Sequence, residues 1–309
     1  MIRQKNLYMA NFNCTFGDDH SPMLDYFEKI ILPSFTNDYK KITSRNTFFF
    51  YNVKIIEYLQ GKFALSGIIV KKTILEVKSL HDEKTQNLIR KDERIPSDPF
   101  SYFTIFLDNH RMVLVKNQSG SPSLKDFERL SQYALKEAVI ESESMNNKLT
   151  ISLNIGSLPS SNKVDEAIDK IAEIQQVVLK LYPLNGDIDD LYGGLREELI
   201  KLGCDEGFAT YKNPQNTSEV RNTLKQSKGI FKPTVRGKGR DGEKITITDN
   251  SVASVLPIRI NEDVNIDENI SNILDQVQDR EELKELSNEN RDKYEEKKNI
   301  LEKLMDLFR

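Results

Sequence analysis

The chain has 309 residues, 38% of them hydrophobic and 30% charged, with a formal net charge of −4 at pH 7. Its apolar residues suffice for a packed interior in one or two domains, which excludes a largely disordered chain. No run approaches the ~20 apolar residues of a membrane-spanning helix, and no apolar segment follows the charged N-terminus as in a signal peptide. We therefore expect a soluble protein that is not inserted in a membrane.

Residues 1–120 predict mainly strands. Short apolar or alternating stretches that are typical of strands occur over residues 6–16, 47–59, 63–79, 102–107 and 112–115. Residues 22–35 show the apolar spacing of a helix, with Ser21 as its N-cap and a proline at its first position. The polar residues 81–99 predict a loop or an excursion at a sheet edge, and residues 108–110 predict a hairpin turn.

A second series of elements follows the break at residues 119–123, which caps a predicted helix over 124–140. Beyond it we expect strands over 149–155, 177–182, 230–235, 244–248 and 253–260, and helices over 163–175, 189–201 and 217–227. The succession of strand, helix, strand and helix is typical of a split βαβ unit. Residues 279–308 predict a long charged helix whose sparse apolar seam packs on its own domain or on a second subunit.

These elements predict an α+β fold with a mixed sheet in the N-terminal domain, then a split βαβ-like domain with a basic β-hairpin, and a long charged C-terminal helix. We expect the domains to cover residues 1–145 and 146–262. Residues 263–309 would form an acidic linker and the C-terminal helix.

Cysteine and histidine are rare in the chain. Cys14 and Cys204 are far apart, which favours a reducing cytoplasm and predicts two buried thiols that act as small apolar side chains. His20, His81 and His110 lie in different predicted turns, without the spacing of a zinc site. We therefore expect no metal, no cofactor and no catalytic residue that depends on histidine.

One group of carboxylates leaves an enzymatic alternative open. Asp187, Asp189 and Asp190 offer the oxygen ligands that Mg²⁺ prefers, as in a metal-dependent nuclease. The same residues also fit the N-terminus of the helix predicted from residue 189, where acidic side chains meet the positive end of the helix dipole. We expect the second role.

A basic segment stands out in this acidic chain. Residues 212–244 hold nine basic and three acidic residues. A strand-to-strand connection with glycines and cations brings the backbone close to phosphates and neutralises their charge, so we expect contact with double-stranded DNA that is largely independent of sequence. The candidate binding residues are Lys225, Lys228, Lys232, Arg236, Lys238, Arg240 and Lys244. Few aromatic residues lie nearby, which argues against a stacking platform for single strands.

Several segments follow one another as they do in a known group of proteins. They are the hairpin from Phe103 to Val115, Gly120-Ser121-Pro122-Ser123 before a helix, the strand from Ile174 to Pro183, the hairpin from Phe231 to Ile247 around Asp241-Gly242-Glu243, the stretch from Ala253 to Pro257, and the charged C-terminal helix. This order resembles the RexA-like phage-exclusion proteins over residues 45–309. The resemblance implies a homodimer that binds DNA with little sequence preference during antiphage defence.

The expected function is therefore a non-catalytic DNA-binding component of a bacterial antiphage system. A further partner would be a membrane or effector protein from the same operon. Two alternatives stay open, the nuclease that uses residues 187–190 and a protein-interaction module that senses a phage protein.

Overall fold

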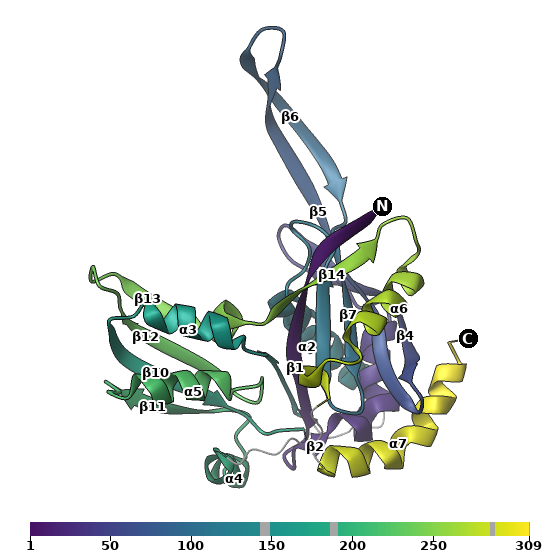
Figure 1. The fold of residues 1–309 in the computed structure, drawn as a ribbon. Coiled ribbons are helices and arrows are strands. Elements are labelled where there is room, and N and C mark those ends of the chain that lie inside the picture. The colour runs from purple at the N-terminus through teal and green to yellow at the C-terminus, as the bar shows by residue number, and fades with distance from the viewer. Residues whose placement is uncertain (143–148, 186–190, 285–287, 309) are drawn as a thin grey trace.

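The computed structural model describes residues 1–142, 149–185, 191–284 and 288–308. Within these residues the fold is α+β, as predicted, with one sheet of ten strands and one of four (Figure 1). They are called the large sheet and the small sheet below. None of the described helices is both long enough and apolar enough to cross a membrane.

The large sheet is built around its first strand. Its strands are β1 (Ile2–Phe16), β2 (Ser21–Pro22), β3 (Lys41–Ile42), β4 (Thr47–Leu59), β5 (Lys62–Asp82), β6 (Asn87–Ser97), β7 (Phe100–Phe106), β8 (Arg111–Lys116), β9 (Ile151–Ser157) and β14 (Val255–Asn261). The order β14-β1-β8-β7-β5-β4-β3 forms its main path. β1 also pairs antiparallel with β9 along residues 10–16. The predicted strands of the first 120 residues and the hairpin turn at 108–110 are thus confirmed.

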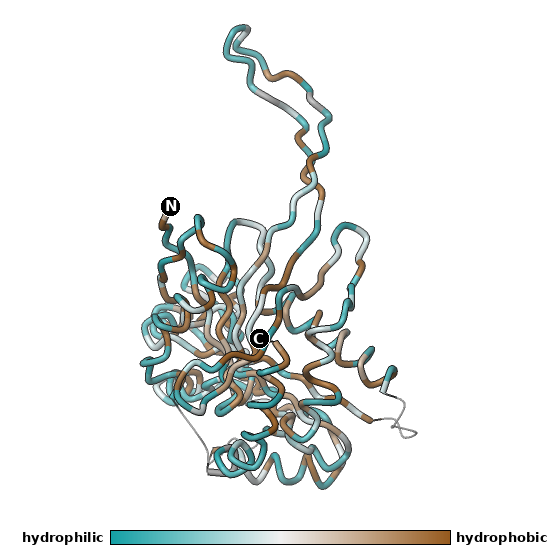
Figure 2. Tube along the Cα trace, turned by 90° about the vertical axis from the view of Figure 1, so that its right-hand side faces the viewer, coloured by the Kyte–Doolittle hydropathy of each residue, from teal (hydrophilic) through white to brown (hydrophobic). Residues whose placement is uncertain are grey.

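Helices cover both faces of the large sheet because β1 is apolar on both faces. Phe12, Cys14 and Phe16 face one core, and Leu7 and Met9 face the other. The first core is closed by η1 (Met23–Tyr26), η2 (Phe27–Ile31), α1 (Leu32–Thr36), α2 (Leu124–Glu141) and α7 (Asn288–Asp306). The second is closed by α6 (Ile266–Val277) and η4 (Glu281–Leu283). Figure 2 shows the hydrophobic residues gathered in this central part.

Two helical predictions need correction. The helix expected from Pro22 begins at Met23, because Ser21 and Pro22 pair with β1 and the Ser21 hydroxyl donates to Asp19 instead of capping. The acidic linker expected from residue 263 contains α6, which buries Ile270, Ile273, Leu274 and Val277 on the sheet. The C-terminal helix α7 packs on its own domain through Tyr294 and Leu301, one of the two predicted arrangements.

The start of α2 gives a first stability test. The Ser123 hydroxyl accepts a hydrogen bond from the backbone N–H of Asp126 at 3.3 Å, and the Asp126 carboxylate accepts one from the Ser123 N–H at 2.9 Å. We expect Ser123→Ala to lower the free energy of unfolding by about 1 kcal/mol, because one N–H at the helix end loses its acceptor. Urea denaturation checks this, with the exposed Ser119→Ala as the unaffected control.

A long ribbon replaces the loop predicted over residues 81–99. β5 continues to Asp82 and pairs with β6 from Thr73 to Ser97, so that a two-stranded arm projects from the large sheet (Figure 1). The loop was predicted because residues 81–99 are mostly polar. Polar residues also fit an isolated ribbon, since the side chains on both of its faces are exposed to solvent. The arm also carries exposed apolar residues, among them Ile74, Leu75 and Leu88, and a cross-strand ion pair joins Arg94 and Glu76 at 3.6 Å.

The small sheet has the order β11-β10-β12-β13, and all of its pairings are antiparallel. Its strands are β10 (Glu173–Leu181), β11 (Gly207–Lys212), β12 (Lys232–Lys238) and β13 (Lys244–Thr248), and the helical segments around it are α3 (Ser161–Asp169), α4 (Gly193–Lys201), α5 (Thr217–Lys225) and η3 (Asp249–Val252). The predicted split βαβ unit is therefore wrong in its pairing, since its first strand, β9, lies in the large sheet. β14 returns to the large sheet as well, so residues 146–262 contribute to both sheets.

Buried polar contacts join the two parts of the molecule. The Asn13 side chain of β1 donates to the carbonyl of Pro183 at 2.7 Å and accepts from the N–H of Asn185 at 2.7 Å. The Arg111 guanidinium of β8 donates to the carbonyl of Lys228 at 2.7 Å. These bonds satisfy backbone groups of the connecting segments that burial would otherwise leave unpaired.

Candidate nucleic-acid interface

Alternation along β12 separates basic from apolar side chains. Pro233 and Val235 are buried against the core of the small sheet, while Lys232, Arg236 and Lys238 point to the opposite side. Successive side chains of a strand point to opposite faces. The basic residues at every second or fourth position of β12 therefore form a row on one face of the sheet. The buried face is covered by α3 and α5, which contribute Val164, Ile168, Val220 and Leu224 to its core (Figure 1).

The register of the small sheet extends this row across four strands. Arg236 lies opposite Gln176 and Thr246, and Lys238 lies opposite Lys244. The same face therefore carries Gln176, Val178, Lys180, Phe208, Thr210, Lys212, Lys232, Thr234, Arg236, Lys238, Lys244, Thr246 and Thr248. All of these side chains are exposed or half-buried. We call this surface the open face.

Half of the cations of the open face are held by neighbours. Lys232 forms an ion pair with Glu128 of α2 at 2.7 Å, and Lys180 pairs with Glu206. The Arg236 guanidinium donates to Gln176 at 3.1 Å, a neutral partner that leaves its charge uncompensated. The two ion pairs compensate the charges of Lys232 and Lys180, whereas Arg236 keeps its charge.

The remaining cations are available for an anion. Lys212, Lys238 and Lys244 are exposed and form no ion pair with any of the residues that the structure describes. Glu173 of β10 is paired with Lys238 of β12 and is the acidic residue among these paired positions. The open face therefore has a strong positive balance, although the whole chain has a net charge of −4.

The tip of the β12–β13 hairpin is shaped by its own acidic residues. The Glu243 carbonyl accepts from the N–H of Gly239 at 2.9 Å, and its carboxylate accepts from the N–H of Asp241 at 3.2 Å. Arg240 is exposed in this turn. Asp241 and Glu243 reduce the positive charge at the tip, so the sheet face rather than the loop carries the larger excess of cations.

The structure divides the predicted binding residues among four places. Lys232, Arg236, Lys238 and Lys244 lie on the open face, and Arg240 lies beside it in the turn. Lys225 and Lys228 lie elsewhere and are described next. Lys180 and Lys212 belong to the open face but were not among the predicted residues. The alternation of β10 could have indicated Lys180, whereas Lys212 needed the strand register.

Lys225 is engaged on the opposite side of the sheet. Its ammonium group is 2.8 Å from the Asp165 carboxylate of α3, which also contacts Arg221. The hydrogen bond from Lys225, assisted by Arg221, holds the pKa of Asp165 below its usual range. Lys225 therefore joins α5 to α3 across the helical layer. Lys228 is exposed at the junction of the two sheets, where its carbonyl accepts from Arg111.

The predictions for metal ligands and for the two thiols can be compared with the described residues. They contain no group of three or more His, Cys, Asp or Glu side chains placed to hold a metal. Asp187, Asp189 and Asp190 lie outside the described residues. Cys14 is buried as predicted, and burial raises the pKa of its thiol. Cys204 is exposed after α4, so the prediction that both thiols are buried is wrong.

The comparisons with known proteins add no relative. No protein-family model matches the chain, and no curated protein matches its sequence.

Proposed function

We propose that this protein binds double-stranded DNA through the phosphate backbone, using the open face of the small sheet. The observation that carries the proposal is the convergence of Lys180, Lys212, Lys232, Arg236, Lys238 and Lys244 on one uncovered face. Four of these residues, Lys212, Arg236, Lys238 and Lys244, keep their charge without an ion-pair partner among the described residues. Exposed lysine and arginine side chains neutralise phosphates and release counterions, which favours binding to DNA of any sequence.

The side chains of the open face fit a duplex better than a single strand. Phe208, at the edge strand β11, is its large aromatic residue. Proteins that hold single strands stack successive bases on several aromatic rings. Thr210, Thr234 and Thr246 add hydroxyl groups, which donate to phosphate oxygens. With four strands about 4.8 Å apart, the face spans about 15 Å, enough to meet phosphates along a backbone.

The biological setting follows from the resemblance to RexA-like proteins. In this proposal the protein is a cytoplasmic, non-catalytic homodimer in a bacterial antiphage system, together with a membrane or effector protein from its operon. Two copies would present two open faces to one duplex, which raises the apparent affinity without new contacts. Sedimentation velocity tests the dimer independently of DNA.

The test of DNA binding is fluorescence anisotropy with a labelled duplex at two salt concentrations. The triple variant Arg236→Gln, Lys238→Gln and Lys244→Gln is expected to bind about tenfold or more weakly, because three phosphate contacts are lost. The log–log dependence of affinity on salt should become shallower by about 3, and the loss should be the same for unrelated sequences.

A matched variant separates the open face from net charge. Lys29→Gln, Arg291→Gln and Lys303→Gln remove the same charge from exposed residues of η2 and α7. These helices cover the large sheet away from the small sheet (Figure 1). This control should keep the affinity and the salt dependence of the wild type. Equal affinity of the open-face variant and the wild type would show that DNA does not bind there.

A further inference from the structure

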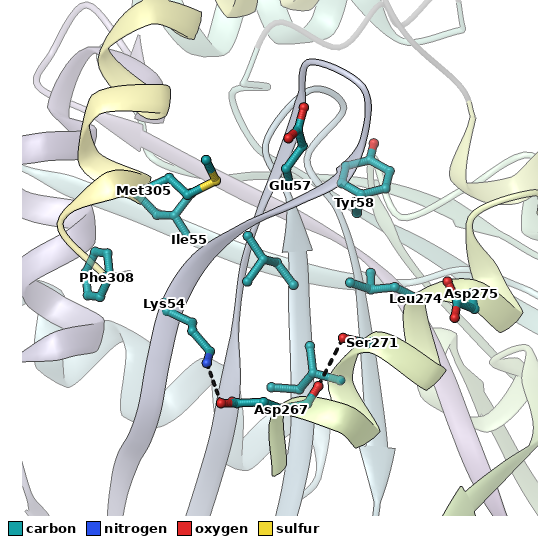
Figure 3. A pocket seen from close by; sticks show the side chains of 12 residues that line it. Lys54, Ile55, Glu57, Tyr58, Asp267, Ser271, Leu274, Asp275, Met305 and Phe308 are labelled. Carbon is teal, nitrogen blue, oxygen red and sulfur yellow. Dashed lines mark hydrogen bonds and ion pairs between the residues drawn. The ribbon is translucent and has the colours of Figure 1, made fainter. Parts of the chain in front are cut away.

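A groove lies between strand β4 and the helices α6 and α7, on the large sheet. Figure 3 shows its lining, with Lys54 to Tyr58 of β4 along the floor. The cavity has a volume of about 500 Å³. Five consecutive strand residues line it, and successive side chains point to opposite faces, so the groove follows the edge of β4 rather than one of its faces.

This edge of β4 has no partner strand along the groove. β5 pairs with one side of β4, and β3 pairs with the other side only at Thr47 and Phe48. Within the described residues, the backbone of residues 54–57 therefore presents a free edge to the groove. Irregular register on either side, between Tyr51 and Lys54 and between Glu57 and Leu59, limits the regular edge to these four residues.

Each wall of the groove combines apolar side chains with a carboxylate. On the α6 side, Ile56, Ile270 and Leu274 form an apolar surface. Asp275 lies beside Leu274 (Figure 3). On the α7 side, Ile55, Met305 and Phe308 form an apolar surface beside Glu57 (Figure 3).

The charges left over in the groove are negative. Lys54 is compensated by Asp267 at 2.6 Å, and the same carboxylate accepts from the Asn52 amide. Glu57 accepts from the N–H of Gly61 at 2.7 Å, and it forms no ion pair with a described residue. Asp275 likewise has no cationic partner in the described part of the chain. Each wall thus offers one apolar surface and one carboxylate that forms no ion pair with the described residues.

We propose that this groove binds an extended peptide segment of a partner protein, which adds to β4 as a further strand. A free strand edge recognises the backbone of an extended chain, and pockets on either side read alternate side chains. The walls fit a segment with two adjacent apolar residues, one for each wall, flanked on both sides by Lys or Arg. This activity is separate from the DNA-binding face of the small sheet.

The test uses the full chain and a labelled probe, acetyl-Thr-Lys-Ile-Val-Lys-Thr-amide. In a strand, its first Lys and Val point to one wall, and Ile and its second Lys point to the other. Fluorescence anisotropy should show saturable binding. The same peptide with Glu in place of both Lys residues should bind at least about tenfold more weakly, because it meets two carboxylates.

Backbone methylation decides whether the peptide binds as a strand. One derivative carries N-methyl groups on the first Lys and on Val, and the other carries them on Ile and on the second Lys. Only one of these two sets of N–H groups faces β4, so one derivative should lose binding and the other should keep it. Equal binding of both derivatives, or no binding of the parent peptide, would overturn the proposal.

Protein variants locate the site. Asp275→Lys should weaken peptide binding about tenfold, and Asp292→Lys on the exposed surface of α7 should leave it unchanged. Sedimentation velocity of the same variants identifies the occupant. Conversion of a wild-type dimer into monomers by Asp275→Lys would overturn the proposal, because a second copy of the chain would then occupy the groove.

Discussion

Replacing Phe35 with alanine is expected to lower the free energy of unfolding by about 4 kcal/mol, the usual cost of deleting a buried phenylalanine ring. Phe35 is buried at the end of the first helical segment. Its ring centroid lies 4.6 to 6.3 Å from those of Phe12, Phe50, Phe103 and Phe127. The substitution therefore leaves a cavity where β1, β4, β7 and α2 meet. Urea denaturation followed by circular dichroism measures the loss.

The matched control is Phe208→Ala on the open face. The Phe208 side chain is 62% exposed on the edge strand β11. Its removal should change the free energy of unfolding by no more than about 0.5 kcal/mol, because no buried contact is lost. It should also leave duplex affinity unchanged if phosphates rather than bases are bound. A loss below about 1 kcal/mol for Phe35→Ala would contradict the central position of this ring.

Local signals in the sequence predicted the elements whose formation depends on neighbours along the chain. The hairpin of β7 and β8 follows from two apolar runs around a polar turn. The start of α2 follows from Ser123 and the apolar spacing behind it. The hairpin turn and the helix N-terminus depend on residues that are close together in the sequence. They can therefore be predicted without knowledge of the tertiary structure.

Pairing between distant segments was not visible in the same way. β1 pairs with β14, more than 240 residues later, and with β9, which the sequence placed in a different unit. The alternation of apolar and polar residues shows that one face of a strand is buried. It does not show which other strand pairs with it. The acidic α6 was missed because its charged face dominates the composition, while four apolar residues at helical spacing cover the sheet.

The candidate interface was predicted in part. The excess of cations in residues 212–244 is visible in the sequence, but the face that they occupy depends on strand register. Lys225 and Lys232 show the limit of counting charges, because their partners Asp165 and Glu128 come from helices far along the chain. No sequence pattern predicted the groove at β4. Whether the edge of a strand is free depends on which strands pair with it, and the residues of the strand alone do not show this.

The junction between the two sheets fixes how the open face is presented. Gly229 lies two residues before the core residue Phe231, and its backbone is in close contact with that of Gly156 in β9. The Gly229 carbonyl accepts from the hydroxyl of Tyr182 at 2.7 Å, and the Arg196 guanidinium donates to the carbonyls of Tyr182 and Ile230. The backbone contact with Gly156 thus connects the small sheet to the large one, and the hydrogen bonds hold residues 229 and 230 in place on the side of the small sheet.

Gly229→Ala is expected to lower the free energy of unfolding by about 3 kcal/mol or more. The φ angle of Gly229 is +78°, in the left-handed region where a side chain is strained. An alanine Cβ would also lie 2.6 Å from the carbonyl oxygen of Gly156 and 2.7 Å from Cβ of Asn11. The first of these neighbours is backbone within a paired strand, which cannot move without disturbing β9. Urea denaturation gives the size of the loss.

Gly242→Ala separates the two causes. Gly242 has nearly the same φ angle, +81°, but apart from its two neighbours along the chain no residue has an atom within 4 Å of the position that a Cβ would take. Its substitution therefore reports the backbone strain alone, about 1 kcal/mol. The difference between the two variants measures the close contact of Gly229 with the large sheet, which amounts to about 2 kcal/mol. Equal losses in both variants would mean that the junction yields to an added methyl group, and that the orientation of the open face is not fixed by this contact.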